Sequence, residues 1–110
     1  MDAKLKAEVN LLHANLCQAI ADPKRILILY ALSEGPKHVT ELAEMLEMPQ
    51  STVSRHLKVL RDRSLVDPAR TGANVQYSLA DARVVEALDL MRAVLVSALA
   101  QQAHLARSLA

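Results

Sequence analysis

Apolar residues recur at steps of three and four positions over much of the chain, the spacing that places them on one face of an α-helix. The first such segment predicts an amphipathic helix over residues 2–20, with apolar positions at Leu5, Val9, Leu12, Leu16 and Ile20. Asp22 and Pro23 then interrupt the pattern and suit the cap and first turn of a second helix. Gly35 and Pro36 are expected to end that helix.

Residues 39–63 predict two further helices joined by a tight turn. A short helix over Val39–Leu46 precedes one that begins at Pro49 or Gln50 and ends near Arg63. The second helix has an apolar face, formed by Val53, Leu57 and Leu60, which predicts that it is anchored in a core. Its opposite face carries small polar and basic residues, as expected of a helix that enters the DNA major groove.

Residues 65–79 change to an alternating pattern, which indicates a β-hairpin. The apolar positions alternate at Val75, Tyr77 and Leu79, and Gly72 and Asn74 mark the bend. Pro68 lacks an N–H group for strand pairing, so it should lie at a sheet edge or in a bulge.

A long final helix is predicted from Asp81 to about residue 107. Together with the first helix, it offers more apolar surface than one small domain needs to bury, which favours a homodimer joined along these two helices. The predicted dimer contacts are Leu5, Val9, Leu12, Leu16, Leu88, Met91, Leu95 and Leu99.

These elements predict a single domain over residues 1–110, mainly α with a small β-hairpin. Their order is that of a winged helix-turn-helix with added N- and C-terminal dimerisation helices. The dimerisation helices are residues 1–20 and 81–107, the helix-turn-helix is 39–63, and the wing is 65–79.

The distribution of charge indicates which face of this fold would bind a partner. The formal net charge is only +1, but the segment from Gln50 to Gln76 holds five basic and two acidic residues. A concentrated basic segment suits docking of double-stranded DNA on one face. The predicted DNA contacts are Gln50, Ser51, Thr52, Ser54, Arg55, His56, Lys58, Arg61, Arg70 and Asn74.

Composition and motifs also bear on the location of the protein and on whether it is an enzyme. The single cysteine, Cys17, allows no intrachain disulfide, and we find neither a signal peptide nor an apolar run of membrane-spanning length, so a cytoplasmic location without a membrane partner is expected. No catalytic constellation or phosphate-cradling glycine loop is recognisable, so an enzyme is not expected. The alternative is a protein-interaction module, because Glu41, Glu44 and Glu47 on the preceding helix could repel phosphate.

Four strings carry a family resemblance: DPKRILIL from Asp22, VTELA from Val39, QSTVSRHLKVLR from Gln50, and VQYSL from Val75. Together they resemble the ArsR/SmtB family of bacterial repressors over about residues 10–95. The resemblance implies a homodimer joined by the first and last helices. It also implies binding to an inverted-repeat operator and repression that an inducer relieves.

Some positions depart from the family pattern. Glu47 occupies a turn position where the family usually has glycine, and Pro49 one where it usually has a capping serine. The metal-binding thiolates of one family site are replaced, because its positions read His38, Val39 and Thr40. A second family site keeps only Asp81, which is better interpreted as a helix cap, since the other ligand positions are Arg83, Val94 and Ser97.

A weaker set of candidate metal ligands remains, and it defines a second alternative. His13 and Cys17 lie four residues apart on the first helix, and His104 lies late in the last helix, which should pack nearby in a dimer. These residues could hold zinc or copper if they converge, or Cys17 could act as a thiol sensor. The leading prediction has no metal and no cofactor, and the inducer is not identified by the sequence.

Overall fold

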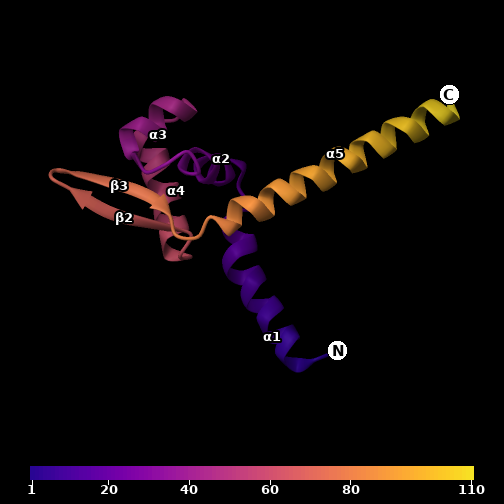
Figure 1. Ribbon diagram of the computed structural model, residues 1–110, viewed down its shortest axis with the longest axis horizontal. Coiled ribbons are helices and arrows are strands. Elements are labelled where there is room, and N and C mark those ends of the chain that lie inside the picture. The colour runs from indigo at the N-terminus through magenta and orange to yellow at the C-terminus, as the bar shows by residue number, and fades with distance from the viewer.

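The computed structural model describes residues 1–110 and confirms a mainly helical chain with a small antiparallel sheet (Figure 1). The elements are α1 (Ala3–Leu12), the π-helical segment η1 (His13–Cys17), α2 (Pro23–Leu32), β1 (Lys37–His38), α3 (Val39–Leu46), α4 (Gln50–Asp62), β2 (Val66–Thr71), β3 (Asn74–Leu79) and α5 (Arg83–Leu109). Helices α2, α3 and α4 gather beside the β2–β3 hairpin, whereas α1 and α5 project away from this body in different directions.

Short sequence signals set the ends of the central helices. The Asp22 carboxylate accepts a hydrogen bond from the Lys24 N–H at 2.8 Å, and Pro23 is the first residue of α2, as predicted. Glu47 ends α3 in the left-handed conformation, with φ 54° and ψ 47°. Pro49 precedes α4 without a side-chain cap, so the turn and the start of α4 form despite both departures from the family pattern.

The core lies where α2, α3, α4 and the start of the hairpin meet. The largest side chains that are fully enclosed are Ile28, Leu29, Leu42, Leu57, Leu60, Val53 and Val66. The three predicted anchors of α4 are all in this set, each with 0% exposure. The amphipathic pattern of α4 therefore fixes which face turns outward.

The sheet has the order β1-β3-β2, with both pairs antiparallel. The predicted hairpin is confirmed, and its turn lies at Gly72, which has a φ of 63°. Pro68 lies on the edge strand β2, opposite Tyr77, where its missing N–H leaves no gap in the sheet interior. The two-residue strand β1 was not predicted, because so short a pairing leaves no alternating pattern in the sequence.

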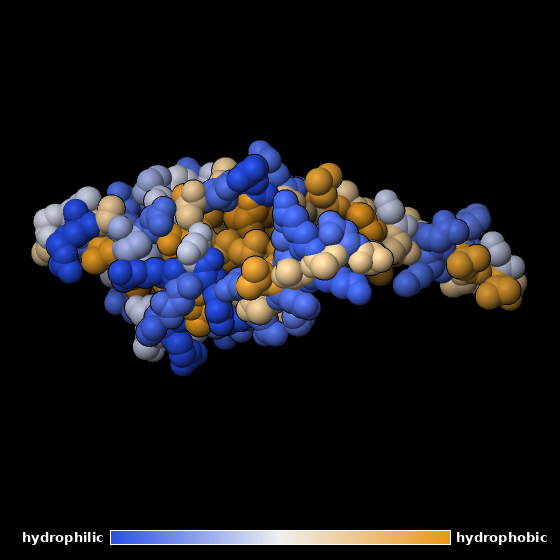
Figure 2. All heavy atoms as spheres, turned by 90° about the horizontal axis from the view of Figure 1, so that it is seen from below, coloured by the Kyte–Doolittle hydropathy of each residue, from blue (hydrophilic) through white to orange (hydrophobic).

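Helices α1 and α5 expose much of their apolar surface. Among the predicted dimer residues, Leu5, Val9, Leu12, Met91, Leu95 and Leu99 are each 44–56% exposed, and Leu16 is half-buried. Figure 2 shows orange, apolar surface at the centre of the molecule and again along the projecting helix. The prediction for Leu88 is wrong: it is only 4% exposed and packs in the core of its own chain.

The body holds α5 through its first turns. The Tyr30 hydroxyl donates to the Asp89 carboxylate at 2.6 Å, and the Arg92 guanidinium lies 5.3 Å from the centre of the Tyr30 ring. Every residue from Met91 to the C-terminus is exposed. None of the helices, α5 included, combines the length and apolar content that crossing a membrane requires.

Candidate nucleic-acid interface

The outward face of α4 is the main candidate surface for nucleic acid. Gln50, Ser51, Ser54, Arg55, Lys58 and Arg61 are all exposed, and Thr52 is half-buried. These polar and basic groups stand opposite the enclosed Val53, Leu57 and Leu60. The core thus holds one side of the helix while the other presents hydrogen-bonding groups and positive charge to solvent.

The start of α4 has free backbone donors. The Thr52 and Val53 N–H groups both bond to the Pro49 carbonyl, at 3.0 and 3.1 Å, but no acceptor is present for those of Gln50 and Ser51. Because Pro49 supplies no capping side chain, these two N–H groups stay open. Such donors, together with the positive end of the helix dipole, favour a phosphate at this end.

The basic side chains of α4 differ in their partners. The Lys58 ammonium lies 3.0 Å from the Asp62 carboxylate, an exposed i,i+4 pair of the kind that contributes little to stability. Arg55 and Arg61 make no ion pair within the chain. Both guanidinium groups are therefore available to an external anion.

The prediction that His56 contacts DNA is wrong. Its side chain is 7% exposed and is the only polar one enclosed in the core. The helical spacing places it beside Leu57 and Leu60, on the inner side of α4, rather than beside Arg55. Its Nδ1 lies 3.5 Å from the Arg25 guanidinium, a contact that the sequence did not predict.

The hairpin forms a second exposed, polar surface, with Arg70 as its one basic residue. Arg70 and Asn74 are both exposed, close to the turn at Gly72. Arg70 pairs with Val75 in the strand register, and Thr71 pairs with Asn74. The hairpin projects from the body beyond α4 (Figure 1), which is the position of a wing.

Of the acidic residues in and directly after α3, only one has a partner within the chain. The His38 N–H donates to the Glu41 carboxylate at 3.0 Å, so Glu41 serves to fix the start of α3. Glu44 and Glu47 are exposed and make no ion pair. The protein-interaction alternative assumes that these acidic residues repel phosphate. Only Glu44 on α3 and Glu47 directly after it are free to do so, and both lie outside α4.

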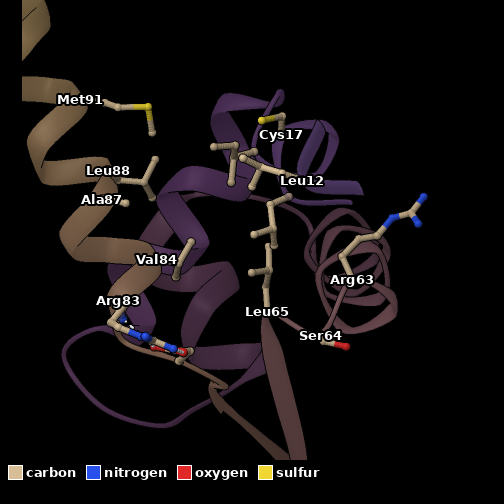
Figure 3. Close-up of a pocket in the computed structure, with 13 residues that line it drawn as sticks. Leu12, Cys17, Arg63, Ser64, Leu65, Arg83, Val84, Ala87, Leu88 and Met91 are labelled. Carbon is tan, nitrogen blue, oxygen red and sulfur yellow. Dashed lines mark hydrogen bonds and ion pairs between the residues drawn. The ribbon is translucent and has the colours of Figure 1, made fainter. Parts of the chain in front are cut away.

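The candidate metal ligands do not converge within one chain. Nowhere in residues 1–110 do three or more histidine, cysteine, aspartate or glutamate side chains lie together as a metal site. Cys17 is exposed and lines an open cavity of about 650 Å³ between the first helix and the start of α5 (Figure 3). His13 and His104 are not among the residues of that cavity.

The positions of the two common family metal sites are occupied by other interactions. The His38 ring Nδ1 lies 3.2 Å from the Val75 carbonyl, which joins α3 to the sheet. The Asp81 carboxylate accepts from the Arg83 N–H at 2.9 Å and from its guanidinium at 2.7 Å. Arg83 therefore holds the pKa of Asp81 down, to about 2. Asp81 was predicted as the cap of this helix, but Ala82 is the residue that directly precedes α5, and Asp81 lies one residue earlier.

The fold and this surface define a winged helix-turn-helix regulator that binds DNA. Residues 22–67 match the model of the arsR family of bacterial regulatory proteins. The chain is 44% identical over 89 residues to the transcriptional regulator NmtR of Mycobacterium tuberculosis, covering 81% of this chain and 71% of NmtR. It is 42% identical to CmtR of the same species, covering 74% of this chain and 70% of CmtR. The chain belongs to the ArsR family of bacterial transcriptional regulators.

Solved structures agree with the fold. The homodimeric winged helix-turn-helix DNA-binding domain of Mb0332 from Mycobacterium bovis superposes with a TM-score of 0.75. It has 26% sequence identity, and the match covers 90% of this chain and 91% of that one. NolR from Sinorhizobium fredii gives a TM-score of 0.74 at 30% identity, covering 86% of this chain and 93% of NolR.

Proposed function

We propose that the protein is a homodimeric transcriptional repressor that inserts α4 of each subunit into the major groove of an inverted-repeat operator. The outward face of α4 carries this proposal. It joins short polar groups at the N-terminal end to basic groups further along, on a helix whose other side is fixed in the core. Such a regulator acts on chromosomal DNA and would work in the cytoplasm.

The candidate DNA-binding residues fall into groups according to the part of the DNA that each can reach. Gln50, Ser51 and Ser54 lie at the N-terminal end of α4, which enters the groove first, so we assign them to base edges. Arg55, Lys58 and Arg61 are assigned to the phosphate backbone, which positions the protein but carries little sequence information. Arg70 and Asn74 in the wing are assigned to the flanking minor groove or phosphates.

A second copy of the chain supplies the symmetry that an inverted repeat requires. The exposed apolar residues of α1 and α5 favour burial against another subunit, because each large apolar side chain gains about 1.5–3 kcal/mol on leaving water. A closed two-fold pairing of these helices would orient two copies of α4 towards two half-sites.

Selection from a random duplex DNA library tests the proposal. We expect the recovered sequences to contain two half-sites in inverted orientation, about 10 base pairs apart from centre to centre. Ser54→Ala should change the preferred bases, whereas Arg55→Ala should weaken binding to all sequences. Arg107→Ala, at an exposed position near the end of α5, is the matched control for loss of one arginine. Recovery of unrelated sequences, or no binding at all, would contradict the proposal.

A further inference from the structure

Arg25 lies at the junction between the end of the first helix and α2. Its Nε donates to the Ala19 carbonyl at 2.5 Å, and its Nη2 donates to the Gln18 carbonyl at 3.1 Å. The Asp22 carboxylate lies 3.8 Å from Nη1, and only 16% of the Arg25 side chain is exposed. Arg25 thus ties the last carbonyls of the first helix to the first turn of α2.

The same guanidinium reaches the DNA-facing helix from inside. Its Nη1 lies 3.5 Å from Nδ1 of His56, at the inner side of α4. A guanidinium only donates hydrogen bonds, so this contact requires Nδ1 to accept, which a neutral imidazole does and an imidazolium does not. His56 is directly preceded by Arg55 and Ser54, which the proposed function assigns to DNA.

We propose that Arg25 and neutral His56 form a positioning link, which holds α4 in its DNA-binding orientation relative to the end of the first helix. The inference rests on the proposed function, because it concerns how the DNA-facing helix is oriented. It assigns a role to two residues that do not touch DNA. The link crosses from the first helix, which carries part of the proposed dimer surface, through α2 to the middle of α4.

The charges around His56 determine how acid affects this link. Arg25 and Lys24 from α2 and Arg55 from α4 oppose a positive imidazole, whereas Asp22 favours it. Burial is the largest influence, and it lowers the pKa of His56 from the ordinary 6.5. A proton on Nδ1 would put two donors face to face, so protonation breaks the link from the His56 side.

His56→Asn separates this role from simple packing. The asparagine Oδ1 takes a position similar to that of Nδ1 and can accept from Arg25, but it does not titrate. DNA affinity is measured by fluorescence anisotropy between about pH 7.5 and pH 5.5, the range in which histidine changes charge. For the wild type we expect the affinity to fall at the acidic end, by less than about tenfold, because the pKa of His56 lies below 6.5. For His56→Asn we expect near-wild-type affinity at pH 7.5 and a flat profile below it.

His13→Asn is the matched control, because His13 is exposed on the first helix. Its profile should follow that of the wild type. A His56→Asn profile that falls as steeply as the wild-type profile would overturn the inference while leaving the proposed function in place. A wild type that binds no DNA at any pH would overturn the proposed function, and the inference with it.

Substitution of Arg25 provides a second test of the positioning link. Arg25→Gln should weaken DNA binding by about tenfold at pH 7.5, since one amide cannot bridge two carbonyls and His56. Arg107→Gln should leave the affinity unchanged, and sedimentation should give both variants the mass of the wild type. The pH profile of Arg25→Gln should also flatten, because the link is already broken. An Arg25→Gln variant with wild-type affinity and profile would refute the positioning role.

Discussion

Glu47 offers a test of the link between local backbone strain and the stability of the helix-turn-helix. Its φ of 54° and ψ of 47° lie in the left-handed region, which a residue with a Cβ adopts at a cost of about 1–2 kcal/mol. The Met48 N–H bonds to the Ala43 carbonyl at 3.0 Å across this turn, so the conformation is fixed by the end of α3. Glu47→Gly removes the steric cost and keeps the turn.

Part of that gain is lost, because glycine gives the unfolded chain more conformational entropy. This entropy stabilises the unfolded state by about 0.4–1 kcal/mol. The free energy of unfolding should therefore rise by about 0.5–1 kcal/mol in Glu47→Gly. Glu44→Gly is the matched control, because it removes the same charge from an exposed position inside α3. There glycine should lower the free energy of unfolding by about 1 kcal/mol.

The assay is urea denaturation at one fixed protein concentration, since subunit association adds to the apparent stability. The midpoints of the two variants should move in opposite directions from the wild type. If both substitutions lower the midpoint equally, the backbone at Glu47 stores no strain and the reasoning is refuted.

Three further outcomes are expected. Leu95→Asp, at a position 56% exposed on α5, should yield monomers in sedimentation and reduce operator affinity, whereas an unchanged mass would exclude this residue from the seam. Tyr30→Phe removes the hydrogen bond to Asp89 and should lower the free energy of unfolding in urea slightly. The lowered pKa of His56 means that the unfolded chain takes up its proton first, so stability should fall as pH drops below 6.5, and less so in His56→Asn. Equal acid sensitivity of the two proteins would contradict this assignment.

The elements with a strong period were predictable from the sequence. The bounds predicted for α3, Val39–Leu46, are those of the structure, and the predicted anchors of α4 all lie in the core. The hairpin was predictable because alternation and a glycine turn specify it together. In each case a local pattern and the burial it requires point to the same structure.

The errors arose where tertiary contacts decide the outcome. His56 follows a basic residue in the sequence, but helical geometry turns it inward, where Arg25 compensates for its burial. Leu88 has the same spacing as Met91, yet only Leu88 lies near enough to the body to be buried in its own chain. Arg25 itself was missed, because its partners are backbone carbonyls that no sequence pattern marks.

The central claim is that α4 and the wing bind the phosphate backbone on either side of the bases that they read. The most direct measurement is the salt dependence of binding to the selected operator. Each subunit presents Arg55, Lys58, Arg61 and Arg70, so a dimer that neutralises one phosphate with each should give a slope of log K against log salt of about −7. Arg55→Ala should reduce the steepness of that slope by about 2. A slope near zero, or one unchanged in Arg55→Ala, would contradict the account.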